Sequence, residues 1–122
     1  MQQPAYYLPI MPYLIVEGAN KFIEFAEKVF GAKVQLNVPR SEGVIMHGEI
    51  TIGNAVVMFA DATETYQPFP ASMFLLVEDV RKTYELGLAN GANSAQEVAE
   101  REYGLSAGLK DAFGNIWWLS QL

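Results

Sequence analysis

The sequence predicts an α+β fold in which two tandem βαβββ modules form a curved mixed sheet around a central cavity. Segment 13–25 recurs as segment 74–86 with five identical positions of 13, where ordinary composition gives about one by chance. A Gly-Asn pair recurs at the same offset of 61, as Gly53-Asn54 and Gly114-Asn115. A similarity at one fixed offset is typical of a duplicated supersecondary unit.

The first module is expected over residues 8–60. It begins with an apolar and aromatic strand at 10–16. A helix follows over 19–30, because apolar residues recur there at helical spacing and Gly31 can end the helix. Three strands separated by turn residues complete the module, at 33–38, 43–52 and 55–60.

The second module is expected over residues 71–122, after a linker at 61–70 that contains two prolines. It repeats the same order, with a strand at 72–77 and a helix at 79–90. Three further strands are predicted at 94–98, 104–111 and 115–120. The two modules together form a single domain of residues 1–122, since 122 residues with 51% hydrophobic side chains suffice for one packed core.

Composition and charge limit the classes of partner. The formal net charge of −6 repels phosphate backbones, so we expect no nucleic-acid partner, and a cationic small molecule is favoured. No apolar run approaches the roughly 18 residues of a membrane span, and the first residues lack the basic start of a signal peptide. We therefore expect a mature, cytoplasmic protein without a membrane partner. The absence of cysteine excludes disulfides and thiolate chemistry.

Several segments resemble the vicinal oxygen chelate superfamily, and most closely its PhnB-like glyoxalase/bleomycin-resistance proteins. The most telling are "EKVFGA" at the end of the first helix and D-x-x-G-N-x-W over Asp111–Trp117. The resemblance runs from about Pro9 to Leu119. It implies the glyoxalase/bleomycin-resistance fold, which hosts both metal-dependent enzymes and metal-free proteins that sequester drugs. It also implies a homodimer, which exposed strand edges favour.

The resemblance further implies metal ligands on the first and last strands of each module. Those positions fall on Met11, Ser72, Trp118 and Val57, or on Met58 in place of Val57 after a one-residue slip. None of these side chains is the His, Glu or Gln that a divalent metal usually takes, and only Ser72 could coordinate weakly. We therefore expect no metal and no cofactor.

Alternation along segment 43–52 separates two faces of a strand. The face toward the helix is predicted to carry Val44, Met46, Gly48, Ile50 and Ile52. The face toward the cavity is predicted to carry Ile45, His47, Glu49 and Thr51. His47 is the only histidine and lies two residues from Glu49 on one face. The two either form an acid–base or ligand-orienting pair, or a hydrogen-bonded pair that stabilises the sheet.

The same alternation predicts further residues that face the cavity, with Tyr103 at its rim: Tyr13, Phe59, Ser72, Phe74 and Trp118. Together with His47 and Glu49 they are the candidate ligand-binding residues. Aromatic walls suit planar or cationic ligands. The alternative is that these rings only fill a small core. Trp117 is expected to face the helix.

Three functions remain open at this point. The first is a metal-free small-molecule-binding protein that sequesters an aromatic or cationic compound, as in antibiotic resistance. The second is a metal-dependent lyase or isomerase of glyoxalase type that uses His47 and Glu49. The third is an assembly piece that binds no small molecule. The sequence does not decide whether the protein is an enzyme, and it does not identify the ligand.

Overall fold

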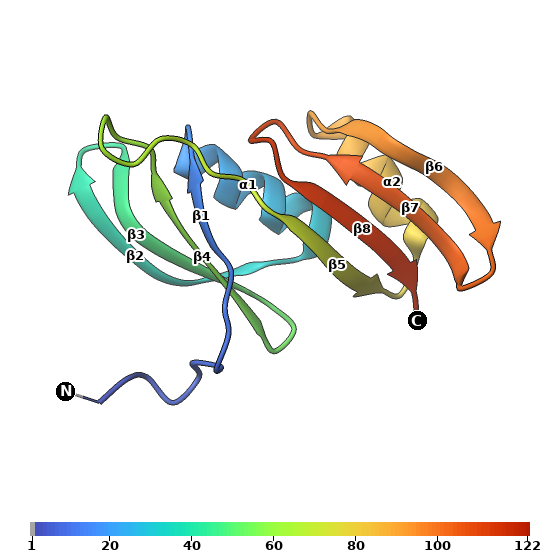
Figure 1. Cartoon of the computed structure of the whole chain (residues 1–122), viewed down its shortest axis with the longest axis horizontal. Helices are drawn as coiled ribbons and strands as arrows, with labels where there is room; N and C mark the ends of the chain where they lie inside the picture. Colours follow the sequence, from blue (N-terminus) through green and yellow to red (C-terminus); the bar gives the residue numbers. More distant parts are fainter. Residues whose placement is uncertain (1) are drawn as a thin grey trace.

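A computed structural model describes residues 2–122 and contains two modules with the same order of elements (Figure 1). Module one consists of β1 (Tyr13–Val16), α1 (Ala19–Phe30), β2 (Lys33–Ser41), β3 (Val44–Ile52) and β4 (Ala55–Asp61). Module two consists of β5 (Ser72–Val77), α2 (Val80–Ala89), β6 (Asn93–Arg101), β7 (Gly104–Lys110) and β8 (Ile116–Gln121). The predicted order of strands and helices is confirmed in both modules.

Each module forms its own four-stranded mixed sheet. The strand order is β1-β4-β3-β2 in sheet one and β5-β8-β7-β6 in sheet two. The first and last strands of each module pair in parallel, and all other pairs are antiparallel. In Figure 1 the two modules lie side by side, with both helices behind the strands. The other side of each sheet is called its open face below.

Helix α1 covers the inner face of sheet one. Its buried apolar stripe consists of Phe22, Ile23, Ala26 and Val29, and the helix ends at Gly31, whose φ of 66° suits glycine. Asp61 joins the start of α1 to the sheet, because its carboxylate accepts hydrogen bonds from the backbone N–H groups of Gly18, Ala19 and Ile45. No helix within residues 2–122 is both long and apolar enough to cross a membrane.

The two modules share one core. The ring of Phe30, at the end of α1, packs 4.4 Å from the ring of Trp117 on β8, measured between centroids. Trp117 is buried, as predicted, and its Nε1–H donates to the Asp111 carboxylate at 2.8 Å. The same carboxylate accepts from the backbone N–H groups of Phe113 and Asn115 and from the Asn115 side chain. The D-x-x-G-N-x-W motif is therefore a buried hydrogen-bonded turn that holds the tryptophan.

The predicted alternation on β3 is correct from His47 onward and wrong before it. Ile45 is buried in the core, and Met46 is 46% exposed on the open face, the reverse of the prediction. The cause is a bulge, because the β2–β3 register passes from Val38–His47 to Pro39–Ile45 and leaves Met46 unpaired. An extra residue of this kind shifts every earlier side chain to the other face.

The predicted position of Phe59 is also wrong. Phe59 is fully buried, lies opposite Gly48, and packs its ring 5.2 Å from that of Phe22 on α1. Val57 belongs to the same core, so Met58 takes the open-face position on β4, as the one-residue slip allowed. Met58 pairs with Tyr13, whereas the equivalent pair in module two is Trp118 with Phe74. The last strands therefore correspond at an offset of 60, while the first strands correspond at 61.

Candidate functional site

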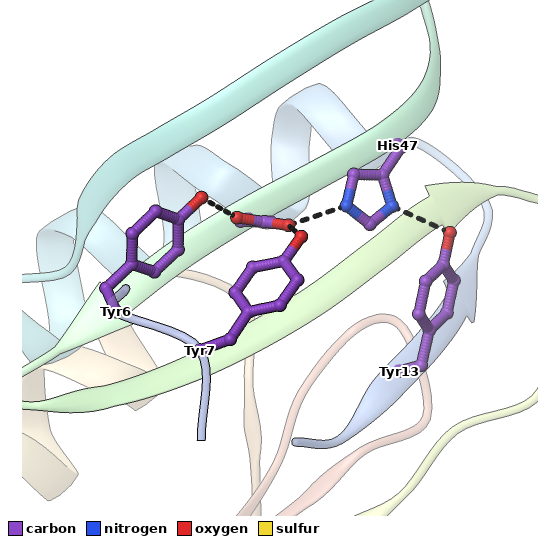
Figure 2. Close-up of polar contacts among 5 residues, drawn as sticks. Tyr6, Tyr7, Tyr13 and His47 are labelled. Atoms are coloured by element: carbon purple, nitrogen blue, oxygen red, sulfur yellow. Dashed lines mark hydrogen bonds and ion pairs between the residues drawn. The ribbon is translucent and has the colours of Figure 1, made fainter. Parts of the chain in front are cut away.

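A chain of hydrogen bonds crosses the open face of sheet one and centres on Glu49 (Figure 2). Its carboxylate accepts from the hydroxyl of Tyr6 on one oxygen. The other oxygen accepts from the hydroxyl of Tyr7 at 2.5 Å and from Nε2 of His47 at 2.7 Å. Nδ1 of His47 lies 3.0 Å from the hydroxyl of Tyr13. The predicted closeness of His47 and Glu49 is thus confirmed, and three phenols extend the pair.

Glu49 is fully buried, and its hydrogen bonds keep the carboxylate ionised there. Burial alone would raise the pKa of Glu49, but the hydrogen bonds from Tyr6, Tyr7 and His47 outweigh it and hold the pKa below its ordinary value. The hydrogen bond to Glu49 in turn raises the pKa of Tyr7 to about 12 and also raises that of Tyr6. At neutral pH the site therefore consists of an ionised carboxylate and protonated phenols.

The carboxylate also fixes the orientation of the imidazole. When Nε2–H of His47 donates to Glu49, Nδ1 is left as an acceptor for the Tyr13 hydroxyl. Burial, and then the Glu49 charge, raise the pKa of Tyr13, so this phenol also stays protonated. Tyr13 borders a recess of about 430 Å³ that Arg40 and Met46 line as well. A hydroxyl, an imidazole and a carboxylate are thus joined in line, with the Tyr13 end of the chain at the recess, an arrangement suited to proton transfer.

A second group of candidate residues lies on the open face of sheet two. Trp118, Phe74 and Tyr103 surround a recess of about 170 Å³, together with Gln96 and Ser106. The Trp118 indole donates to the hydroxyl of Ser72 at 2.8 Å. It also lies against Gly108, where a Cβ would come within 2.9 Å of the ring. The indole is therefore held flat across the sheet by a hydrogen bond and by the absence of a side chain beneath it.

The eight predicted site residues divide into three sets. Tyr13, His47 and Glu49 lie on sheet one. Ser72, Phe74 and Trp118 lie on sheet two, Tyr103 lies in the turn between β6 and β7, and Phe59 lies in the core. The recess beside Tyr13 and the recess beside Trp118 share no lining residue. Tyr13 and Trp118 therefore border two separate recesses, one on each sheet.

Sequence reasoning missed Tyr6 and Tyr7. They precede β1 in a segment without strand or helix periodicity, so no pattern assigns them to a face. The only signal is a pair of adjacent aromatic residues near the start of the chain. Their contact with Glu49 spans 42 and 43 positions of sequence.

The residues present do not fit the metal that the resemblance implies. The positions that the resemblance implies, Met11, Ser72, Trp118 and Met58, carry two thioethers, a hydroxyl and an indole, and the Ser72 hydroxyl already accepts the indole N–H of Trp118. The open-face pairs beside them, Tyr13 with Met58 and Phe74 with Trp118, add only one phenol oxygen. A divalent site needs three or four N, O or thiolate donors. Within residues 2–122 no group of three His, Cys, Asp or Glu residues could hold a metal ion.

An alkaline titration followed by tyrosinate absorbance tests the Glu49 cluster. The pKa of Tyr7 is raised from 10.0 to about 12, so its hydrogen bond contributes stability that is present below pH 10.0 and is lost as the pH rises through about 12. In Glu49→Gln the late-ionising phenols should return toward the ordinary value. Superimposable titration curves for the two proteins would contradict the cluster.

Comparison with known proteins identifies the family of this chain. The model of the Glyoxalase/Bleomycin resistance protein/Dioxygenase superfamily matches residues 7–119. An uncharacterized protein of Mycobacterium bovis is 27% identical over 124 residues, which cover 92% of this chain and 82% of that protein.

Two solved structures share the fold. A PhnB protein from Bacillus cereus superimposes with a TM-score of 0.77 at 17% identity, covering 94% of this chain and 100% of the other. TnmS3 from Streptomyces sp. CB03234, an antibiotic binding protein, gives 0.71 at 18% identity, covering 94% and 98%. Since the family model spans nearly the whole chain, this protein belongs to the Glyoxalase/Bleomycin resistance protein/Dioxygenase superfamily.

Proposed function

We propose that this protein binds a small aromatic or cationic molecule without a metal, and that it sequesters that molecule. The observation that carries the proposal is the chemistry of two cross-strand pairs on the open faces, Tyr13 with Met58 and Phe74 with Trp118. Aromatic and thioether groups stand there in place of metal donors. A surface of this kind binds ligands by stacking, cation–π attraction and burial of apolar area.

Exposure of the aromatic rings supports the proposal. The exposed fractions are 47% for Tyr13, 65% for Phe74, 64% for Tyr103 and 38% for Trp118. Rings that only filled a core would be buried, as Phe59 is. The net charge of −6 favours a cationic ligand over an anionic one. An antibiotic binding protein with the same fold, TnmS3, supports the ligand class by analogy alone.

A homodimer is part of the proposal. The two half-sites of one chain are open recesses on separate sheets, so a second copy facing them would turn two shallow surfaces into a closed chamber. Exposed apolar side chains on the open face of sheet two, such as Phe74, would be covered in that arrangement.

A second candidate function is proton transfer to a bound molecule. It is favoured by the Tyr13–His47–Glu49 chain, in which a hydroxyl, an imidazole and a carboxylate are joined by hydrogen bonds of 3.0 and 2.7 Å. The two candidates differ in the fate of the ligand. Sequestration returns the compound unchanged after denaturation of the protein, whereas proton transfer returns an isomer or a cleaved product.

Calorimetric titration with bleomycin and with ethidium, two aromatic cations, tests the proposal. We expect binding that Trp118→Ala weakens about tenfold or more, since the loss of one stacking or cation–π partner is worth roughly 1–2 kcal/mol. Leu122→Ala is the matched control, because it also removes an exposed apolar side chain but lies outside both recesses. Equal affinities of Trp118→Ala and the control would contradict the proposed surface.

A further inference from the structure

The N-terminal arm, residues 2–12, is tied to the sheet mainly through Glu49. The arm leaves sheet one at the start of β1 (Figure 1). The phenols of Tyr6 and Tyr7 both donate hydrogen bonds to the Glu49 carboxylate (Figure 2), and the Gln35 side chain also lies beside the Tyr6 hydroxyl. The backbone of the arm adds one bond, from the N–H of Met58 to the carbonyl of Pro12.

Before Met11 and Pro12, which are half-buried next to the start of β1, the apolar side chains of the arm do not anchor it. Ile10 is 88% exposed and Leu8 is 40% exposed, so neither is packed into the core. Tyr6 and Tyr7 are only half-buried, and their rings meet edge to face at 5.2 Å. The arm is thus a loosely packed segment whose specific contact is the delivery of two phenol hydroxyls to one carboxylate.

Glu49, by contrast, is built into the sheet. It sits in the middle of β3, paired with Met58 on β4 and with Leu36 on β2. Nε2 of His47 is hydrogen-bonded to one oxygen of the Glu49 carboxylate. The remaining acceptor positions of the carboxylate point to the open face, where one phenol donates to each oxygen. A buried carboxylate needs such donors, because an unpaired one is costly. The donors on the open face need not come from the same chain.

We propose that Glu49 and His47 form a binding site for hydroxyaryl compounds, which the arm fills with its own two phenols until such a compound displaces it. The chemistry is read from the present occupants: the site already accepts aryl hydroxyl groups, one on each carboxylate oxygen. The inference deepens the proposed function, since it narrows an aromatic ligand to one that carries phenolic O–H groups. It rests on the proposed function in one respect, because both the proposed function and this inference require a small aromatic ligand.

Competition between the arm and a free ligand sets the expected effect. Tethered groups act at an effective concentration in the millimolar range, so a free phenol binds the intact protein weakly. Removal of the two tethered phenols frees the carboxylate. The apparent dissociation constant for a free phenol equals the intrinsic constant divided by the fraction of molecules with an open site, so it falls as that fraction rises. The affinity for a phenol should therefore rise when the arm loses its tyrosines.

The test uses 4-nitrophenol as the probe. This phenol titrates near neutral pH, and only its anion is yellow, so a site that binds the protonated form bleaches the solution at fixed pH. In the full chain carrying Tyr6→Ala and Tyr7→Ala we expect binding about tenfold tighter than in the unmodified protein. Addition of Glu49→Gln to that variant should abolish the bleaching. Phe69→Ala, which removes an exposed aromatic ring outside both recesses, should change nothing.

A second measurement needs no variant. Chymotrypsin cleaves after tyrosine, so 4-nitrophenol should speed cleavage of the unmodified protein at Tyr6 and Tyr7 by releasing the arm. Unchanged cleavage, or equal bleaching with and without the Glu49→Gln substitution, overturns the inference. Failure of the Trp118-dependent titration with ethidium, alongside Glu49-dependent bleaching, would instead contradict the proposed function and leave this site standing. The reverse pattern would remove this site alone.

Discussion

Replacement of Asp111 by alanine is expected to lower the free energy of unfolding by about 3–5 kcal/mol, and the midpoint of thermal unfolding by roughly 10 °C or more. Asp111 is buried and accepts four hydrogen bonds, from two backbone N–H groups, the Asn115 amide and the Trp117 indole. Its loss leaves those donors without a partner in a dry interior. It also releases Trp117 from the packing that joins the two modules.

Asp79→Ala is the matched control for this substitution. Asp79 also accepts a backbone N–H, from Lys82 at 3.1 Å, but it caps the exposed start of α2. Removal of such a cap costs about 1 kcal/mol. Denaturant unfolding of the three proteins gives the comparison, and equal losses of stability for the two aspartates would refute the role assigned to the D-x-x-G-N-x-W turn.

Phe59→Ala is expected to lower the free energy of unfolding by about 3–5 kcal/mol, because it empties a fully buried site between Gly48 and Phe22. Phe74→Ala is the matched control on the open face of sheet two, where a surface substitution changes stability by about 0.5 kcal/mol or less. Thermal unfolding of both variants measures the difference.

The two phenylalanines should separate in the opposite sense when ligand affinity is measured. Phe74 borders the recess beside Trp118, so its removal should weaken the binding of ethidium. A Phe59→Ala protein that remains folded at low temperature should keep most of its affinity. A stable Phe59→Ala protein with lost binding would mean that the ring reaches the ligand, as the alternation had suggested.

Duplication is the reason that the fold could be predicted in detail. The repeat fixed the order of elements twice, so each uncertain strand had a better-defined counterpart in the other copy. Strand boundaries were less accurate. The second strand was predicted to end at residue 38, yet β2 continues through Pro39 to Ser41, because β2 is an edge strand and does not need the missing N–H of proline for pairing.

The site was predicted only as far as local geometry determines it. The pair of His47 and Glu49 follows from a spacing of two on one strand, which holds in any register. The faces of Ile45 and Phe59 depend on a bulge and on a one-residue difference between the last strands, and both are properties of pairing between distant segments. The contact of Tyr6 with Glu49 corresponds to no periodic pattern in the sequence.

Metal dependence of ligand binding is the most direct test of a metal-free site. Ethidium, which does not chelate divalent ions, would be titrated into protein dialysed against a chelator, and again after addition of Zn²⁺ or Mn²⁺, with bound metal measured in parallel. A metal-free site predicts the same dissociation constant in both titrations and no stoichiometric uptake of metal. One tightly bound ion per chain, with a ligand affinity that appears only when the ion is present, would contradict it.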